Sequence, residues 1–159
     1  MEKVKALEEE LRQKFGDDLG IRFGLGANTD EWLKIPPDEK GEPDLTLFYK
    51  YKRVCYIDVS GSDKVTMTLT GDIWVRPDKF NEAKKRTEET WFYMVYKNAI
   101  YVLDRKTIEP YEGNIKIVHI KRNQTGRRIP EKYISIPCSE AYPKEEMFQW
   151  IEQKIATIT

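Results

Sequence analysis

The sequence predicts a mixed α/β fold in which a central mixed sheet is flanked by helices. Amphipathic helical patterns stand at both ends of the chain, over residues 1–15 and after Pro143. Between them lie several short runs rich in β-branched and aromatic residues, interrupted by a helical pattern after Pro77. Helices and strands in this order bury their apolar surfaces most economically when the helices pack on the faces of one sheet.

The helices are predicted from the period and ends of their patterns. The first has one apolar stripe and stops at Gly16, a residue typical of helix C-termini; the stripe is Val4, Leu7, Leu11 and Phe15. The pattern over residues 78–89 has few apolar residues, which predicts a surface helix. The last helix begins after Pro143, which suits a first helical turn, and turns four residues inward: Met147, Phe148, Ile151 and Ile155.

Strands are predicted where β-prone runs end at turn residues. They are expected at residues 21–23, 45–50, 54–60, 65–70, 73–75, 91–96, 99–103, 115–120 and 133–137. Residues 51–53 and residues 97–98 each suit a tight hairpin turn. The run 65–70 alternates apolar and polar residues, as a half-buried strand would. The runs 91–96 and 99–103 are continuously apolar, which predicts central strands buried on both faces.

The length and composition of the chain limit its class. Its 159 residues suit a single domain spanning 1–159, and its 27 acidic and 27 basic residues leave no net charge that would indicate a partner. Cys55 and Cys138 lie in apolar runs, so we expect two buried free thiols in a reducing, cytoplasmic compartment. Two distant cysteines and one histidine lack zinc-ligand spacing. No apolar segment reaches the ~18 residues of a membrane span, and the charged N-terminus is no signal peptide.

Two aspartates are the strongest candidates for chemistry. Pro43-Asp44 precedes the run 45–50, and Asp58 lies fourteen residues beyond Asp44, in the run 54–60. If these runs are neighbouring strands, the two carboxylates can converge at one end of the sheet. Mg²⁺ needs few protein ligands because it keeps several waters, and a bound divalent cation can activate water beside a phosphodiester. The alternative is that Pro-Asp is a turn element and Asp58 a partly exposed strand residue.

The motifs around these aspartates resemble those of a known enzyme superfamily. A helix carrying Glu8, then Gly-Glu-Pro-Asp44, a hairpin and Tyr-Ile-Asp58-Val-Ser60 resemble the PD-(D/E)XK nucleases. The spacing is similar to that of archaeal Holliday-junction resolvases. The resemblance covers about residues 1–104. It implies a restriction-endonuclease-like fold and phosphodiester hydrolysis that depends on Mg²⁺ or Mn²⁺. It also implies a nucleic-acid substrate, which we expect to be DNA, and a homodimer as a candidate assembly.

The resemblance also implies roles for individual residues. Asp44 and Asp58 match the two metal-binding acids that act in catalysis. Glu8 matches the acid of the first helix, with Glu9 and Glu10 as less favoured alternatives.

Ser60 departs from the superfamily pattern, because a lysine is expected where it stands. A hydroxyl cannot stabilise developing phosphate charge as an ammonium does. Two interpretations stay open. In the first, a lysine reaches the site from elsewhere in the chain; the candidates are Lys64, Lys84 and Lys85. In the second, catalysis is lost and the chain is an inactive module that binds nucleic acid or a protein partner. We expect a DNA endonuclease, with Lys64 or Lys85 replacing the missing lysine.

Basic residues are the candidates for nucleic-acid binding. Residues 121–132 carry five basic side chains against Glu131 alone. A flexible basic loop suits contacts with phosphates that do not read the base sequence. The residues assigned to binding are Lys84, Lys121, Arg122, Arg127 and Arg128. The alternative for each is an ordinary solvated surface.

Overall fold

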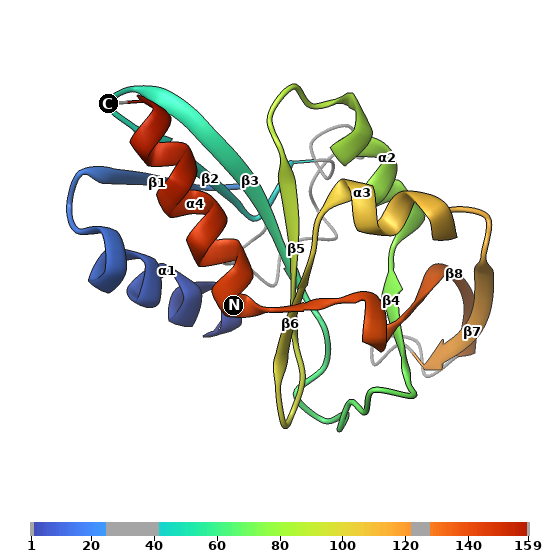
Figure 1. The fold of residues 1–159 in the computed structure, drawn as a ribbon. Coiled ribbons are helices and arrows are strands. Elements are labelled where there is room, and N and C mark those ends of the chain that lie inside the picture. Colours follow the sequence, from blue (N-terminus) through green and yellow to red (C-terminus); the bar gives the residue numbers. More distant parts are fainter. Residues whose placement is uncertain (1, 25–41, 122–127, 159) are drawn as a thin grey trace.

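The fold is known from a computed structural model that describes residues 2–24, 42–121 and 128–158 (Figure 1). Its helices are α1 (Glu2–Phe15), α2 (Pro77–Lys85), α3 (Arg105–Ile108) and α4 (Lys144–Ile158). Its strands are β1 (Leu19–Phe23), β2 (Leu45–Tyr49), β3 (Lys52–Ser60), β4 (Asp72–Val75), β5 (Thr90–Val95), β6 (Ile100–Leu103), β7 (Ile115–Lys121), β8 (Arg128–Pro137) and β9 (Tyr142–Pro143).

A six-stranded mixed sheet forms the centre, in the order β1-β2-β3-β5-β6-β9. β3 and β5 run parallel, and the other neighbours in this sheet are antiparallel. A second, three-stranded antiparallel sheet has the order β4-β8-β7. The predicted fold class, a mixed central sheet flanked by helices, is confirmed. The second sheet was not predicted.

The central sheet is covered on both faces (Figure 1). On one face it packs against α1 and α4, in an apolar cluster that includes Leu7, Leu11 and Ile151. On the other face α2, α3 and the second sheet close a separate cluster. β5 serves both: Trp91 and Tyr93 join the first cluster, whereas Phe92 and Met94 join the second. This alternation confirms β5 as a central strand with two buried faces.

The β2–β3 hairpin is tighter than predicted. Its turn is Lys50-Tyr51, and both residues have positive φ, 50° and 66°. Two-residue turns of this kind match the right-handed twist of the flanking strands. The turn pairs Tyr49 with Lys52, and a register shift between Leu47 and Phe48 then brings Leu45 opposite Ile57.

The predicted strand over residues 65–70 is wrong, because this segment joins neither sheet. The side chain of Asn98 takes the place of a strand partner. Its Oδ1 accepts from the Met67 N–H and its Nδ2 donates to the Met67 carbonyl, each at 2.8 Å. The Lys97 N–H donates to the Val65 carbonyl at 2.9 Å. The segment therefore packs against the β5–β6 turn, and its alternating pattern does not indicate a ladder.

Helix α2 ends at Lys85, four residues before the predicted end. Arg86 is extended, with φ −83° and ψ 146°. The guanidinium of Arg105, which lies far along the chain, donates to the carbonyls of Ala83 and Arg86 at 3.0 and 2.7 Å. These bonds satisfy the Arg86 carbonyl and add to the bond that the Arg86 N–H makes to the Ala83 carbonyl at the helix end.

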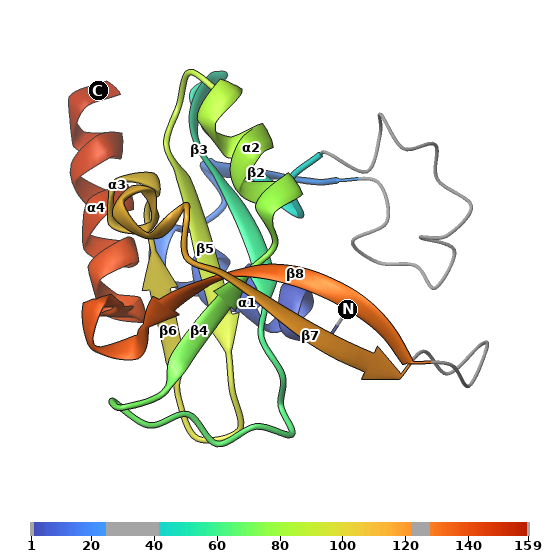
Figure 2. The same cartoon turned by 90° about the vertical axis from the view of Figure 1, so that its right-hand side faces the viewer.

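The β7–β8 hairpin is longer than predicted, because β8 begins at Arg128 and not at residue 133. The two strands run together beyond the four-residue β4 (Figure 2). Cys55 and Cys138 are both buried free thiols, as predicted. Among the helices of the described residues, none combines the length and apolarity needed to cross a bilayer.

Candidate active site

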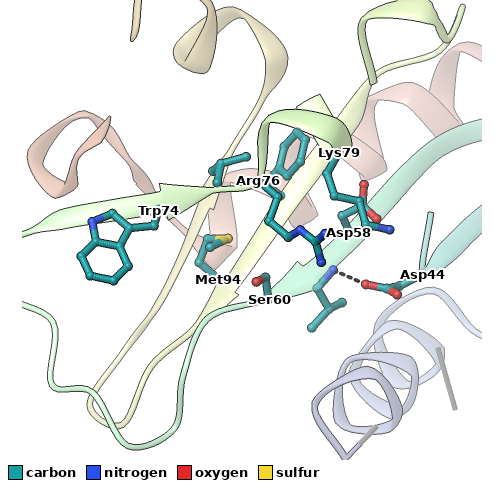
Figure 3. Close-up of a pocket in the computed structure, with 10 residues that line it drawn as sticks. Asp44, Asp58, Ser60, Trp74, Arg76, Lys79 and Met94 are labelled. Atoms are coloured by element: carbon teal, nitrogen blue, oxygen red, sulfur yellow. Dashed lines mark hydrogen bonds between the residues drawn. The ribbon is translucent and has the colours of Figure 1, made fainter. Parts of the chain in front are cut away.

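Asp44 and Asp58 meet at the end of the β2–β3 pair. Because Leu45 pairs with Ile57, the next residue along each strand brings Asp44 opposite Asp58. Opposite residues in an antiparallel pair have Cα atoms about 4.5–5.5 Å apart, with side chains on the same face. The Val59 N–H donates to Oδ2 of Asp44 at 2.7 Å and holds this carboxylate at the strand end (Figure 3). The predicted convergence of the two acids is therefore present.

Both carboxylates are in a low-dielectric environment that opposes their ionisation. Asp58 is 4% exposed. Burial, and then the charge of Asp44, raises the pKa of Asp58 to about 6, although Lys79 and Arg86 act in the opposite direction. Burial also raises the pKa of Asp44, partly offset by the Val59 N–H and by Lys79. Burial disfavours a charged carboxylate, and a second carboxylate nearby adds repulsion.

By strict hydrogen-bond geometry neither carboxylate oxygen of Asp58 has a partner within the described residues, although the backbone N–H of Asp44 is near enough to lower the pKa of Asp58. Arg86 Nη1 lies 3.5 Å from Asp58 Oδ2, which is an ion pair without hydrogen-bond geometry. The guanidinium of Arg86 also stacks 5.0 Å from the Tyr56 ring centroid and donates to Thr90 Oγ1 at 3.2 Å. Buried polar atoms usually have partners, so the bare oxygens of Asp58 are suited to a ligand.

A hollow of about 200 Å³ opens above the two aspartates. Two basic side chains line this hollow together with the acids (Figure 3). Arg76 directly precedes α2, and Lys79 lies in its first turn. Arg76 is also paired with Asp78, at 3.3 Å from Nε to Oδ1. Ser60 lines the same hollow, two residues beyond Asp58 and on the same face of β3. The expected basic group is therefore present, but it comes from another element.

The periodicity of α2 explains which lysine reaches the acids. The helix buries Phe80 and Ala83. At 100° per residue, Lys79 flanks this buried stripe on one side, Lys84 flanks it on the other, and Lys85 points away. Accordingly Lys84 pairs with Glu112, and Lys85, with its side chain 72% exposed, pairs with Glu82. Neither lines the hollow, so the structure does not bring Lys85 to the site.

Lys64 and Glu8 also lie outside the hollow. Lys64 is exposed in the loop after β3, where its N–H donates to Ser62 Oγ. Glu8 pairs with Arg12 of its own helix at 3.3 Å. Of the alternatives in that helix, Glu10 pairs with Lys144 and Glu9 is exposed. Across the described residues, no three histidine, cysteine or acidic side chains are grouped to hold a metal ion. A metal at this site would rest on two carboxylates.

The basic loop cannot be placed beside the site. Arg122 and Arg127 lie outside the described residues, and for Lys121 and Arg128 only the strand backbone is described. Their assignment to nucleic-acid binding stays a prediction. Sequence analysis singled out neither Arg76 nor Lys79. The position of Lys79 beside the buried stripe of α2 was the signal that distinguished it.

Gly24 allows the close approach of chain segments that positions Asp44. Its N–H donates to the Asp44 carbonyl at 2.9 Å, and a Cβ there would collide with the carbonyl oxygen of Pro43. We expect Gly24→Ala to lower the free energy of unfolding by about 1–3 kcal/mol, the usual effect of overpacking. Urea titration measures this change. Gly113→Ala is the control, because a Cβ there meets no atom within 4 Å. Equal midpoints for the two variants would contradict this role of Gly24.

Comparisons with known proteins support the fold. No protein-family model matches the chain, and no curated protein sequence matches it. Solved structures do match, among them a nuclease from a fusselovirus, with a TM-score of 0.52 and 18% sequence identity. The match covers 99% of this chain and 90% of the viral one. At this identity the likeness shows a shared fold.

Proposed function

We propose that this protein is a metal-dependent nuclease of the PD-(D/E)XK type, with DNA as its substrate and Asp44 and Asp58 at its catalytic centre. One observation carries the proposal. A buried carboxylate, that of Asp58, faces a second carboxylate across a strand pair, beside two basic side chains that line the same hollow. The fold shared with a viral nuclease adds support.

The two aspartates fit a hard divalent cation such as Mg²⁺ or Mn²⁺. Mg²⁺ is usually bound through one or two carboxylates and retains waters, so a third protein acid is not required. The carboxylate oxygens of Asp58 are available as ligands for the cation. Burial raises the pKa of both acids, so a bound cation would stabilise their ionised forms. When bound there, the cation would lower the pKa of a water and neutralise charge on a scissile phosphate.

The chain's own residues would position the substrate and stabilise charge. The Val59 N–H keeps Asp44 Oδ2 in place, and Arg86 forms an ion pair with Asp58. Lys79 would face the phosphate oxygens and stabilise the charge that develops there, the role of the lysine expected at Ser60. Arg76, exposed in part at the rim, would attract the backbone phosphates.

The alternative function is a non-catalytic nucleic-acid-binding module of the same fold. Its specific support is Ser60, together with the buried ion pair between Arg86 and Asp58, which already compensates part of the acidic charge. In this case Arg76 and Lys79 would bind phosphates, and no bond would be broken.

A cleavage assay separates the two functions. Purified protein is incubated with labelled linear, flapped, branched and single-stranded DNA, with Mg²⁺, with Mn²⁺ or with EDTA. The proposal expects cleavage with either metal, none with EDTA, and none by Asp58→Asn. Asp63→Asn, in the exposed loop after β3, is the matched control and should cleave normally. Binding without cleavage in every condition would support the non-catalytic module, whereas cleavage that survives in Asp58→Asn would exclude the proposed centre.

A further inference from the structure

A second hollow adjoins the candidate active site and is lined by aromatic side chains. Its volume is about 340 Å³, within the ~300–1,000 Å³ typical of small-ligand sites. Ser60 and Trp74 line both hollows, so the two lie side by side. In Figure 3, Trp74 lies at the opposite end of the site from Asp44. A nucleic-acid strand with one phosphate at the two aspartates would contact this aromatic surface where it extends beyond the site.

The aromatic surface is the outward face of the second sheet. Ile73 and Val75 of β4 are buried, whereas Trp74 between them points outward and is 36% exposed. Tyr133 of β8 lies beside it, with ring centroids 5.8 Å apart and planes at 31°. Lys116, which pairs with Tyr133 across the β7–β8 ladder, places its Nζ 4.8 Å from the Trp74 ring centroid. Two aromatic rings and a cation thus share one face.

Aromatic rings next to a basic side chain suit an unpaired nucleobase. Every base has a π-face that can stack on an aromatic ring, and stacking needs a base whose face is not covered by a duplex neighbour. Lys116 can neutralise the phosphate of the same nucleotide. Asp72, at the edge of the hollow, is an acceptor for an exocyclic amino group such as that of cytosine.

We propose that Trp74, Tyr133 and Lys116 form a stacking surface for an unpaired base of the strand whose phosphate lies at Asp44 and Asp58. The inference rests on the proposed function, because it names the feature of the substrate that this site recognises. It predicts preferred binding of substrates with single-stranded segments, such as flaps or splayed ends, over uninterrupted duplex.

Binding of labelled oligonucleotides tests the surface directly, in buffer with EDTA so that no strand is cut. The probes are a single strand containing 2-aminopurine, its fully paired duplex and the RNA strand of the same sequence. Stacking on the protein should quench 2-aminopurine in the single strand. The DNA and RNA strands show which backbone the surface accepts.

Trp74→Ala should weaken single-strand binding by roughly 5- to 150-fold, the range that corresponds to ~1–3 kcal/mol per stacked base. Duplex binding should change little, and the quenching should disappear. Trp74→Phe keeps an aromatic face and should retain most of the affinity. Tyr51→Ala, at the β2–β3 turn, removes a fully exposed aromatic ring from a different part of the surface and is the matched control. Thermal melting checks that all variants are folded.

The outcomes separate this inference from the proposed function. If Trp74→Ala binds the single strand as the wild type does, or if the wild-type protein binds no oligonucleotide, the stacking surface is refuted. Metal-dependent cleavage that is lost in Asp58→Asn would still stand. Conversely, Trp74-dependent binding and quenching without any cleavage would keep the surface and refute the nuclease.

Discussion

Lys79→Ala is expected to slow phosphodiester cleavage by about 100- to 1,000-fold, the usual effect of removing one group that stabilises transition-state charge. Lys79 is the lysine that lines the hollow with Asp44 and Asp58, and its charge lowers the pKa of both. Substrate binding should weaken less than the rate constant falls, because the charge that Lys79 offsets is largest in the transition state. Single-turnover kinetics with saturating enzyme measure this rate constant.

A second substitution makes this prediction specific. Ser60 and Asp58 lie on the same face of β3, so a lysine at position 60 would extend into the same hollow. Ser60→Lys in the Lys79→Ala background should therefore restore part of the lost rate. Lys64→Ala and Lys85→Ala are the matched controls and should cleave at close to the wild-type rate. A wild-type rate in Lys79→Ala, or a large loss in either control, would exclude Lys79 as the replacement lysine.

Asp58→Asn is expected to abolish cleavage and, at the same time, to make stability less dependent on pH. In the absence of metal, the pKa of Asp58 is raised to about 6 by burial and by Asp44. The folded wild type therefore holds a proton that the unfolded chain releases at about pH 4. Its stability should fall as the pH rises from 4 through 6, because the folded state binds more protons in this window.

The variant lacks this ionisation, so its stability should fall less in the same window, where the raised pKa of Asp44 remains. The difference in unfolding free energy between Asp58→Asn and the wild type should increase by about 2 kcal/mol between pH 4 and pH 8, since each pKa unit corresponds to about 1.4 kcal/mol. Urea titrations in EDTA at a series of pH values measure it. Asp63→Asn should follow the wild-type curve. Parallel curves for Asp58→Asn and wild type would mean that Asp58 ionises normally.

Metal provides an independent check of the same residue. A cation that binds the folded state stabilises it in proportion to the logarithm of its concentration above the dissociation constant. Mg²⁺ or Mn²⁺ should therefore stabilise the wild type above pH 6, and the effect should diminish below pH 6 as Asp58 becomes protonated. Asp58→Asn should show little stabilisation at any pH. Equal stabilisation of both proteins would place the metal elsewhere.

Local patterns were sufficient for the elements that carry the two acids. The helix over residues 1–15, the hairpin after Asp44 and the buried β5 are all present. The helix depends on a period of 3.6, the hairpin on a turn between adjacent runs, and β5 on a continuous apolar run. Prediction failed for the run 65–70, because the side chain of Asn98 provides the partner that a strand would have provided. The predicted β8 is also too short, because sequence analysis assigns residues 128–132 to the basic loop; they pair instead with residues 117–121 of the neighbouring strand β7.

The sequence by itself determined the acidic pair. Asp44 directly precedes β2 and Asp58 lies in β3, so a tight turn and one register shift within a short stretch of chain bring the two acids together. Only the tertiary structure decided which basic residue joins them. Lys79 reaches the acids because Phe80 and Ala83 pack in one cluster with Phe92 and Met94 of β5, and this packing brings the start of α2 over the end of β3. Contacts between distant segments form only in the folded chain, and no local period encodes them.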